Sequence, residues 1–240
     1  GPQQIGLAAT WNTELVRKGA ENTAKEVAAS GIPWNFSPVV DLGRDPRWPR
    51  FWETFGEDPY LAGEMGVAMV RGFQDGPSPI AATLKHFLGY GLTLSGKDRT
   101  PAWIPERQLL EYFVPSFQAC VDAGAMSIMV NSGEMNGIPV HSNKAILTDL
   151  LREEMGFEGV VVSDWEDVKY LVTRHRIALD YKDAARMAIE AGLDMAMVPL
   201  DLEFSDALIE LVEEGTISEQ RLDVSVRRIL TMKYRLGLFE

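Results

Sequence analysis

An aspartate and a tryptophan close one of the short apolar runs of this 240-residue chain. The run 159–163 leads directly into Asp164 and Trp165. A buried strand would hold the Asp164 carboxylate at a fixed height, and the flat ring of Trp165 suits the apolar C–H face of a sugar. Glycoside cleavage needs such an anion beside an oxocarbenium-like centre. The plainer interpretation is an aspartate that caps the next helix and a tryptophan that packs in the core.

A lysine and a histidine stand side by side at the end of another apolar run. Lys85 and His86 can both donate hydrogen bonds to hydroxyl groups. Neighbouring strand residues point to opposite faces, so both reach one pocket only where the strand twists or bulges. Two alternatives stay open. One is a lysine in an internal salt bridge beside a buried histidine, and the other is the Schiff-base lysine of an aldolase.

Arginines and acidic residues gather after a third apolar run. Arg44, Asp45, Arg47 and Arg50 follow Asp41 within ten positions. Most of this group reads as a loop tied together by ion pairs. A single arginine directed inward would be enough to clamp vicinal hydroxyls.

The elements that must position these residues alternate along the chain. Short β-branched runs predict buried strands, and amphipathic stretches with capping residues predict helices between them. The expected strands cover residues 5–9, 34–40, 80–87, 127–131, 160–163 and 195–198. The expected helices cover 13–30, a segment opening at Asp58-Pro59, a segment opening at Pro105 that Pro115 should kink, 145–155, 180–191, 201–214 and 218–236.

This alternation favours an α/β protein with one parallel sheet, and a (β/α)8-like TIM barrel is the favoured architecture. Six strands are two fewer than a closed eightfold barrel needs, so we expect a barrel truncated to about six βα units. Residues 1–240 are expected to form this one partial barrel domain. A doubly wound open sheet is the competing fold, but no glycine-rich phosphate fingerprint follows any strand. In a barrel, the polar strand ends converge on one mouth.

Composition excludes several classes of partner. The 23 Lys and Arg against 35 Asp and Glu give a net charge of −12, which argues against nucleic acid and anionic membranes as partners. No apolar run approaches the ~20 residues of a membrane helix. Cys120 is the only cysteine, and neither His141 nor His175 has a partner at metal-ligand spacing. We therefore expect no metal and no cofactor, and both histidines to be structural or solvated.

Six motifs in order resemble the barrel domain of glycoside hydrolase family 3, which includes exo-acting β-glucosidases and β-xylosidases. They lie at 5–12, at 35–59 with RDPRW at 44–48, at 85–87 (KHF), at 136–139 (NGIP), at 156–165 (GFEGVVVSDW) and at 225–230 (SVRRIL). The resemblance implies that Asp164 is the nucleophile of a retaining mechanism with a covalent glycosyl intermediate. It implies that Arg50, Lys85 and His86 hold the hydroxyls of the non-reducing-end sugar of a β-glucoside or short β-glucan, and that Trp165 lines the mouth.

The chain also departs from the family pattern. Ser132 stands where a tyrosine usually lies near the nucleophile, and with Met129 it completes the expected substrate-binding set. Pro49 replaces a common glycine. Where many members have an arginine shortly after Lys-His, this chain has Lys97, Asp98 and Arg99, and no one of them is assigned.

The resemblance implies that the first barrel strands, and the second domain that usually carries the acid/base glutamate, lie outside this sequence. We therefore expect weak or no activity from this chain alone, with Glu134 or Glu166 substituting in part. We also expect the open barrel seam to be covered by a second copy or a complementary fragment, or to be removed by a rearranged closure of the barrel. The alternative is a catalytically silent barrel fragment or engineered scaffold that self-associates.

Overall fold

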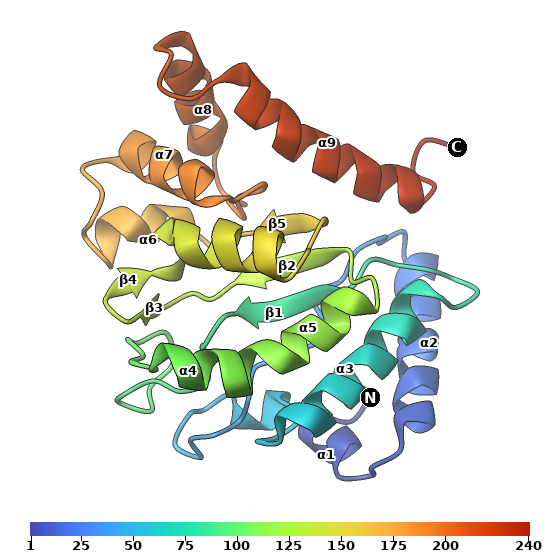
Figure 1. The fold of residues 1–240 in the computed structure, drawn as a ribbon. Helices are drawn as coiled ribbons and strands as arrows, with labels where there is room; N and C mark the ends of the chain where they lie inside the picture. Colours follow the sequence, from blue (N-terminus) through green and yellow to red (C-terminus); the bar gives the residue numbers. More distant parts are fainter.

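A twisted parallel sheet runs through the centre of the computed structural model, which describes residues 1–240 (Figure 1). Its strands are β1 (Thr83–Phe87), β2 (Ser127–Val130) and β5 (Val160–Val162), in the order β1-β2-β5. Residues 34–40 extend the sheet beyond β1 through parallel bridges from Trp34 to Ala81 and from Val39 to Lys85, and Met195 extends it beyond β5. Five parallel segments therefore follow one another in space in their sequence order.

The predicted strand at 5–9 is wrong, because this stretch lies in the short helix α1 (Gln4–Ala8). A five-residue apolar run does not distinguish a strand from a buried helical turn. The Gln4 side chain is the reason for the placement. Its amide donates to the Val39 carbonyl at 2.7 Å and accepts from the Val39 N–H at 2.9 Å, so it satisfies backbone groups at the edge of the sheet.

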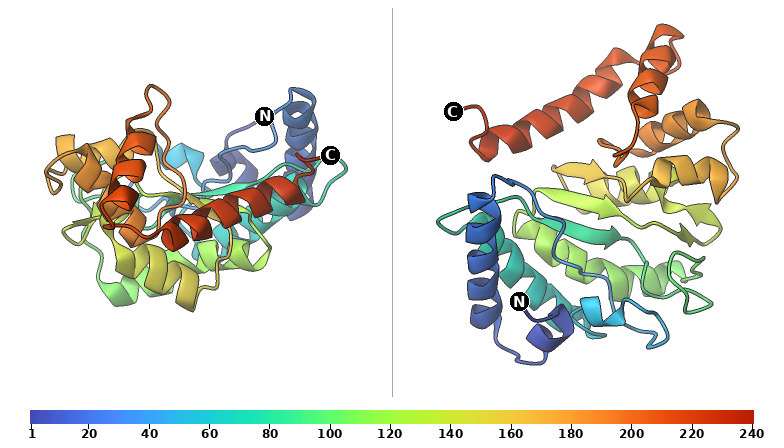
Figure 2. Two further views of the ribbon diagram at one scale, coloured as in Figure 1. Left: turned by 90° about the horizontal axis from the view of Figure 1, so that it is seen from above. Right: turned by 180° about the vertical axis from the view of Figure 1, so that it is seen from behind.

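Three helices pack in a row beside the sheet (Figures 1 and 2). They are α2 (Thr13–Ala29), α3 (Pro59–Gln74) and α5 (Val114–Asp122), and α3 contacts both of the others. The predicted cap at Asp58 is confirmed, since its carboxylate accepts from the Leu61 N–H at 2.9 Å. These helices and the sheet contribute to one core of 48 buried residues, which runs from Ala8 to Ile217.

The helix predicted to open at Pro105 is divided, as expected from Pro115. It consists of α4 (Glu106–Gln108), a π-helical segment η2 (Leu109–Phe113) and α5, with Pro115 in the first turn of α5. The remaining elements are the 3-10 turns η1 (Phe51–Glu53) and η3 (Val140–Ser142), the π-helical η4 (Ala145–Glu154), the hairpin strands β3 (Glu134–Met135) and β4 (Ile138–Pro139), and the helices α6 (Asp167–Thr173), α7 (Tyr181–Ala191), α8 (Glu203–Glu213) and α9 (Glu219–Arg235).

The sheet is open rather than closed between residues 34–40 and Met195, since no backbone pairing joins these two edges. The count of six strands is therefore not met, although the strand order suits a barrel wall. A small cluster of Ala81, Val160 and Met232 lies at this opening, and Trp34 and Met195 pack against it from opposite edges. The expected second copy or complementary fragment at this seam stays a prediction.

A buried aspartate ties α9 to the sheet. Asp194 accepts hydrogen bonds from Arg152 (2.7 Å), Arg228 (2.9 Å), the Ser225 hydroxyl (2.6 Å) and the Val161 N–H (2.9 Å). Its charge is thus fully paired inside the protein, which a buried carboxylate requires.

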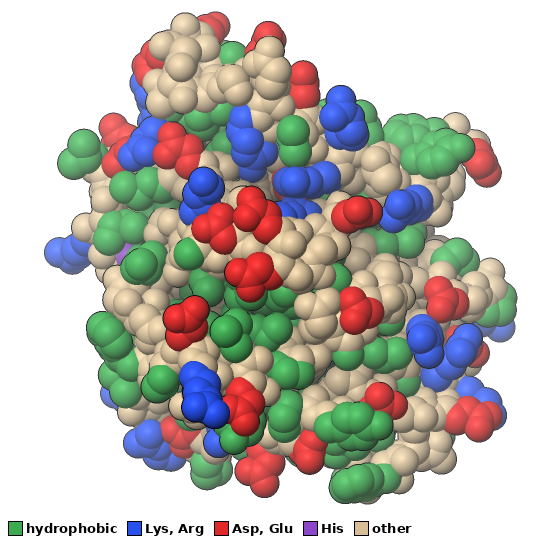
Figure 3. All heavy atoms as spheres, viewed as in Figure 1, with side chains coloured by type: hydrophobic (Ala, Val, Ile, Leu, Met, Phe, Trp, Pro, Cys, Tyr) green, Lys and Arg blue, Asp and Glu red, His purple; other side chains and the backbone are tan.

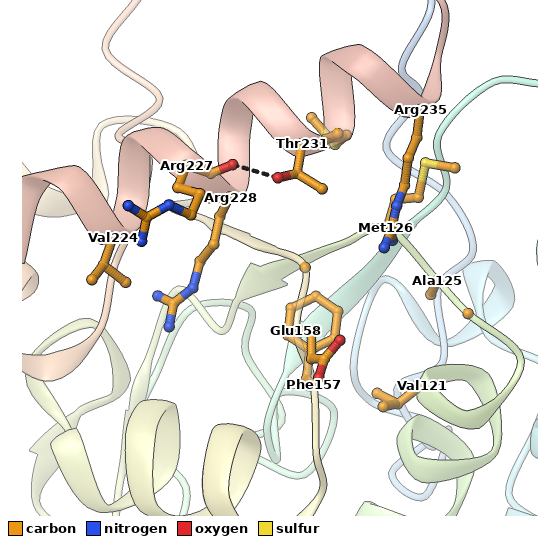
Figure 4. A pocket seen from close by; sticks show the side chains of 13 residues that line it. Val121, Ala125, Met126, Phe157, Glu158, Val224, Arg227, Arg228, Thr231 and Arg235 are labelled. Carbon is orange, nitrogen blue, oxygen red and sulfur yellow. Dashed lines mark hydrogen bonds between the residues drawn. The ribbon is translucent and has the colours of Figure 1, made fainter.

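A cavity of about 400 Å³ lies between α9 and the loops that precede β2 and β5 (Figure 4). Arg227, Arg228 and Arg235 line it from α9, above Met126 and Glu158. The strands begin at this edge, so the cavity lies away from the strand ends where the predicted site residues gather, and none of those residues lines it. On the face seen in Figure 3, acidic and basic side chains are interspersed. No helix is long and apolar enough to span a membrane.

Candidate active site

Buried polar residues collect where the parallel segments end. Asp41 follows residues 34–40, His86 lies in β1, Ser132 follows β2 and Asp164 follows β5. All four are buried, although polar residues usually stay in contact with water. The carboxyl ends of neighbouring parallel strands meet at one edge, as the strand arrows in Figure 1 show, and this edge is the usual ligand side of such sheets.

Asp164 is held by its backbone and by one of its two carboxylate oxygens. Its Oδ1 accepts from the Trp165 N–H at 2.6 Å, and its own N–H donates to His141 Nε2 at 3.2 Å. Burial lowers the pKa of His141 to about 3, so its imidazole is neutral and can accept this bond. Oδ2 has no hydrogen-bond partner, with Arg99 Nη1 at 3.6 Å and His86 Nε2 at 4.0 Å. One oxygen is therefore fixed and the other is free.

The pairing register of β1 shifts between Leu84 and Phe87, which is the irregularity that the Lys85-His86 pair was expected to need. His86 lies against Asp41, with its backbone N–H 2.9 Å from Oδ1 and its ring Nδ1 2.8 Å from Oδ2. Burial lowers the pKa of His86 and raises the pKa of Asp41. The pair therefore carries no net charge and holds one proton between Nδ1 and Oδ2, which leaves an Nε2–H on the side of Asp164.

The Lys85 ammonium belongs to the same group of charges. Burial lowers its pKa, and Arg50 acts in the same direction, while Glu53, Asp164 and Asp41 favour the charged form. Lys85 and His86 therefore both interact with the charges of Asp41 and Asp164, and their role in holding a sugar stays a prediction.

Arg50 is already bound within the protein. Its guanidinium donates to both carboxylate oxygens of Glu53, at 3.0 and 2.9 Å, and to the Tyr90 hydroxyl at 3.1 Å. Burial opposes its charge, but Glu53 and Tyr90 outweigh burial, so the pKa of Arg50 is raised. A fork fixed in this way is preorganised to hold a further ligand.

Arg99 is the main residue that the sequence did not assign. Its guanidinium donates to the Ser132 hydroxyl and lies 3.6 Å from Asp164 Oδ2 and 3.8 Å from Asp167 Oδ2. Ser132, at the family's tyrosine position, therefore contacts Arg99 and makes no hydrogen bond to Asp164. The available signal was an arginine in the loop after Lys-His. Its backbone has a φ of +58°, so only the folded loop shows where it points.

Asp167 was also missed. It is 1% exposed and lies three residues after Asp164 in the chain. The Arg99 guanidinium lies close to both carboxyl groups. Burial and then the charge of Asp164 raise the pKa of Asp167 to about 7. The helix α6 begins at Asp167, five positions after the end of β5, and its bounds were not predicted, so nothing in the pattern pointed this carboxyl inward.

The other predicted residues lie around this centre. Trp165 is 48% exposed beside Asp164. Met129 is buried in β2 and alternates with Ile128 and Val130, which join the large core, so it lies on the opposite face of the sheet. Glu134 pairs with His175 at 2.9 Å and Glu166 with Lys169 at 3.5 Å. Neither glutamate has a contact with Asp164.

A buried carboxylate at the strand ends therefore lies close to two hydrogen-bond donors, those of His86 and Arg99. The model of the glycosyl hydrolase family 3 N terminal domain matches residues 1–232, and the chain belongs to this family. The fold of the family is an α/β barrel of the TIM type.

The similar proteins are named β-glucosidases in several cases and β-xylosidases in others. The chain is 54% identical to the "Lysosomal beta glucosidase" of Dictyostelium discoideum, over 99% of this chain and 30% of that protein. It is 38% identical to the "Periplasmic beta-glucosidase" of Salmonella typhimurium, over 99% of this chain and 31% of that protein. The β-glucosidase from Listeria innocua, solved with glucose, superimposes with a TM-score of 0.95 at 38% identity, over 99% of this chain and 34% of that one. The chain thus spans about a third of the length of these relatives.

Proposed function

We propose that this chain is the nucleophile-bearing part of an exo-acting, retaining β-glycosidase. The substrate is a β-glucoside or a short β-glucan, from which the non-reducing-end sugar is removed. The observation that carries the proposal is the asymmetry of Asp164, whose Oδ1 is clamped by the Trp165 N–H while Oδ2 is free and faces two donors. The match to the family model and the relative solved with glucose support a glucoside as the substrate.

In the first step, Asp164 Oδ2 attacks the anomeric carbon, and the bond from that carbon to the leaving oxygen breaks. The leaving group departs with the bonding electrons and takes up a proton. In the second step, a water molecule attacks the same carbon, loses a proton and releases the sugar, and the carboxylate of Asp164 is restored. Two inversions give net retention.

Lys85, His86 and Arg50 are the residues proposed to hold the sugar hydroxyls. The Nε2–H of His86 faces the Asp164 side of the pocket, and Arg50 is fixed by Glu53 and Tyr90. Donors fixed in advance lose little entropy when a substrate binds, and they help to align the anomeric carbon with the nucleophile. Trp165 would supply the apolar ring surface beside them.

Retention needs a second carboxyl group that acts as acid and then as base, roughly 5 to 5.5 Å from the nucleophile. Within residues 1–240, Glu134 and Glu166 are held by His175 and Lys169, and Asp167 is shared with Arg99. We propose that these residues by themselves turn substrate over slowly, since losing an acid/base costs about 10² to 10⁴ in rate. Leaving groups that need no proton would be affected least.

The experiment is therefore covalent labelling with 2,4-dinitrophenyl β-glucoside, read by mass spectrometry. One glucosyl residue should appear on the peptide that contains Asp164. Asp164→Asn should abolish the adduct, and Asp149→Asn, at an exposed aspartate without an ion pair, should leave it intact. An adduct that survives Asp164→Asn would exclude Asp164 as the nucleophile, and so would the absence of any adduct on the native protein.

A further inference from the structure

An exposed tryptophan stands on a rigid three-segment ribbon beside the proposed active site. The ribbon consists of the hairpin β3–β4 and residues 102–104, which pair with it through a parallel bridge between Ala102 and Met135. Ala102 and Ile104 are each 1% exposed, whereas Trp103 between them is 58% exposed. Strand alternation buries the two neighbours and therefore directs the Trp103 indole outward.

Several hydrogen bonds fix this ribbon. The Ala102 N–H donates to the Glu134 carbonyl and the Asn136 N–H to the Ala102 carbonyl, each at 2.9 Å. The Asn136 side chain accepts from the Ile104 N–H at 2.7 Å and donates to the Ile104 carbonyl at 2.8 Å. The segment that carries Trp103 is thus held on both sides of the indole, so the ring has a fixed place rather than a mobile one.

The turn of the hairpin leaves room for the ring. Asn136 (φ +52°) and Gly137 (φ +85°) are both left-handed, as a two-residue type I′ turn requires. A Cβ at Gly137 would lie 3.5 Å from Trp103 Cη2, so one edge of the indole rests on this glycine. More than half of the Trp103 surface is exposed to solvent.

The loop that leads to Trp103 also carries Arg99. This loop is closed by the bond from the Leu94 N–H to the Pro101 carbonyl at 3.0 Å and by the Ser95 and Thr100 hydroxyls at 2.8 Å. Four residues span at most about 14 Å, so Trp103 lies within that distance of Arg99 along the backbone. Arg99 is itself 3.6 Å from Asp164. The indole is therefore carried by the segment that follows this loop, four residues along the chain from the arginine beside Asp164.

We propose that Trp103 is a second stacking platform, on which an outer glucosyl residue of a β-glucan chain lies while its terminal sugar occupies the pocket at Asp164. The inference rests on the proposed function and narrows its substrate to oligomeric β-glucans. The ring edge of Trp103 lies on the uncharged Gly137, and the neighbours of Trp103 in the chain, Ala102 and Ile104, are uncharged too, which suits a neutral ligand. One ring is far too small for a protein interface of about 1,000 Å². The apolar C–H face of a pyranose matches it in size and shape.

The test is affinity electrophoresis of the native chain in gels that contain laminarin, a β-1,3-glucan, with dextran gels as the reference. Trp103→Ala should weaken laminarin binding about tenfold, the loss of stacking by one ring, and Trp103→Phe should retain most of it. Tyr234→Ala removes an aromatic ring that is 74% exposed on α9 and serves as the matched control with unchanged binding. Thermal unfolding checks that each variant folds.

Asp164→Asn separates this inference from the proposed function. This variant should lose covalent labelling and still bind laminarin in a Trp103-dependent manner. Laminarin binding that is equal in native protein and Trp103→Ala would overturn the platform, and so would native protein that binds laminarin no better than dextran. If laminarin binds through Trp103 but Asp164 is not labelled, the proposed nucleophile fails and the platform stands.

Discussion

Replacing Asp167 by asparagine should stabilise the protein at neutral pH and flatten its response to pH. The Asp167 carboxyl is buried, and neither oxygen accepts a hydrogen bond of good geometry. Burial and the charge of Asp164 raise its pKa from 3.8 to about 7, and the nearby Ser132 hydroxyl and Arg99 only partly offset this. Asparagine keeps the shape and removes the charge that burial penalises.

The direction of this pKa change decides whether the protein gains or loses stability as pH rises. While the unfolded chain ionises above pH 4, the folded carboxyl stays protonated until about pH 7, so the free energy of unfolding falls as pH rises through this window. The pKa values of the two states differ by about 3, and at about 1.36 kcal/mol for each the limit is about 4 kcal/mol. This is an upper bound, because Arg99 and Arg174 lose an anion in the variant.

Urea unfolding across the range from about pH 5 to about pH 8 tests this. The stability of Asp167→Asn relative to the native protein should increase by roughly 2 to 3 kcal/mol between pH 5 and pH 7 and then level off. Asp149→Asn, at an exposed position, should show no such trend. A difference that stays constant with pH would refute the titration of Asp167, and a difference that falls with pH would reverse the reasoning.

Three further predictions concern other buried groups. Asp194→Ala should lower the free energy of unfolding in urea by about 3 to 5 kcal/mol, because Arg152 loses its buried partner. Trypsin should then cleave within α9. If α9 stays resistant, its apolar contacts alone are enough to hold it on the protein. Asp41→Asn should slow covalent labelling less than tenfold, since the neutral pair with His86 needs a hydrogen bond rather than a charge; a loss near the ~10⁴ seen where an orienting carboxylate is essential would show that Asp41 is ionised. Cys120 is fully buried and its pKa is raised to about 12, so it should react with a thiol reagent only after unfolding.

The parts of the fold that could be predicted are those with local signals. Period, caps and prolines located most of the helices, and Asp58 and Pro115 act as their chemistry predicts. The strand predicted at 5–9 was wrong because the conformation of this stretch depends on a long-range contact, the hydrogen bond of Gln4 to Val39. Residues 34–40 pair as an edge segment that follows Pro33 and is interrupted by Pro38, and neither proline has an N–H to donate.

The site residues, too, could be predicted only where the signal is local. Asp164, Lys85 and His86 could be placed because each ends or lies in an apolar run, and strand geometry fixes where such residues meet. Arg99 and Asp167 could not, since one depends on the conformation of a loop and the other on the burial of a helix start. Residues placed by loops need the folded chain, because sequence spacing says little about direction there.

The distribution of charge around Asp164 suits a reaction in which the sugar becomes positive. A cationic histidine beside the anomeric carbon would repel an oxocarbenium-like centre, and it would weaken the attraction that Asp164 supplies. Burial of His86 against Asp41 avoids this, because the pair is neutral and still presents an N–H. Arg99 lies 3.6 Å from Oδ2 of the nucleophile and 3.8 Å from Asp167, whose ionisation above about pH 7 offsets part of the Arg99 charge. Asp41 and Asp167 therefore have the same effect: they allow hydrogen-bond donors to lie close to Asp164 without an excess of positive charge.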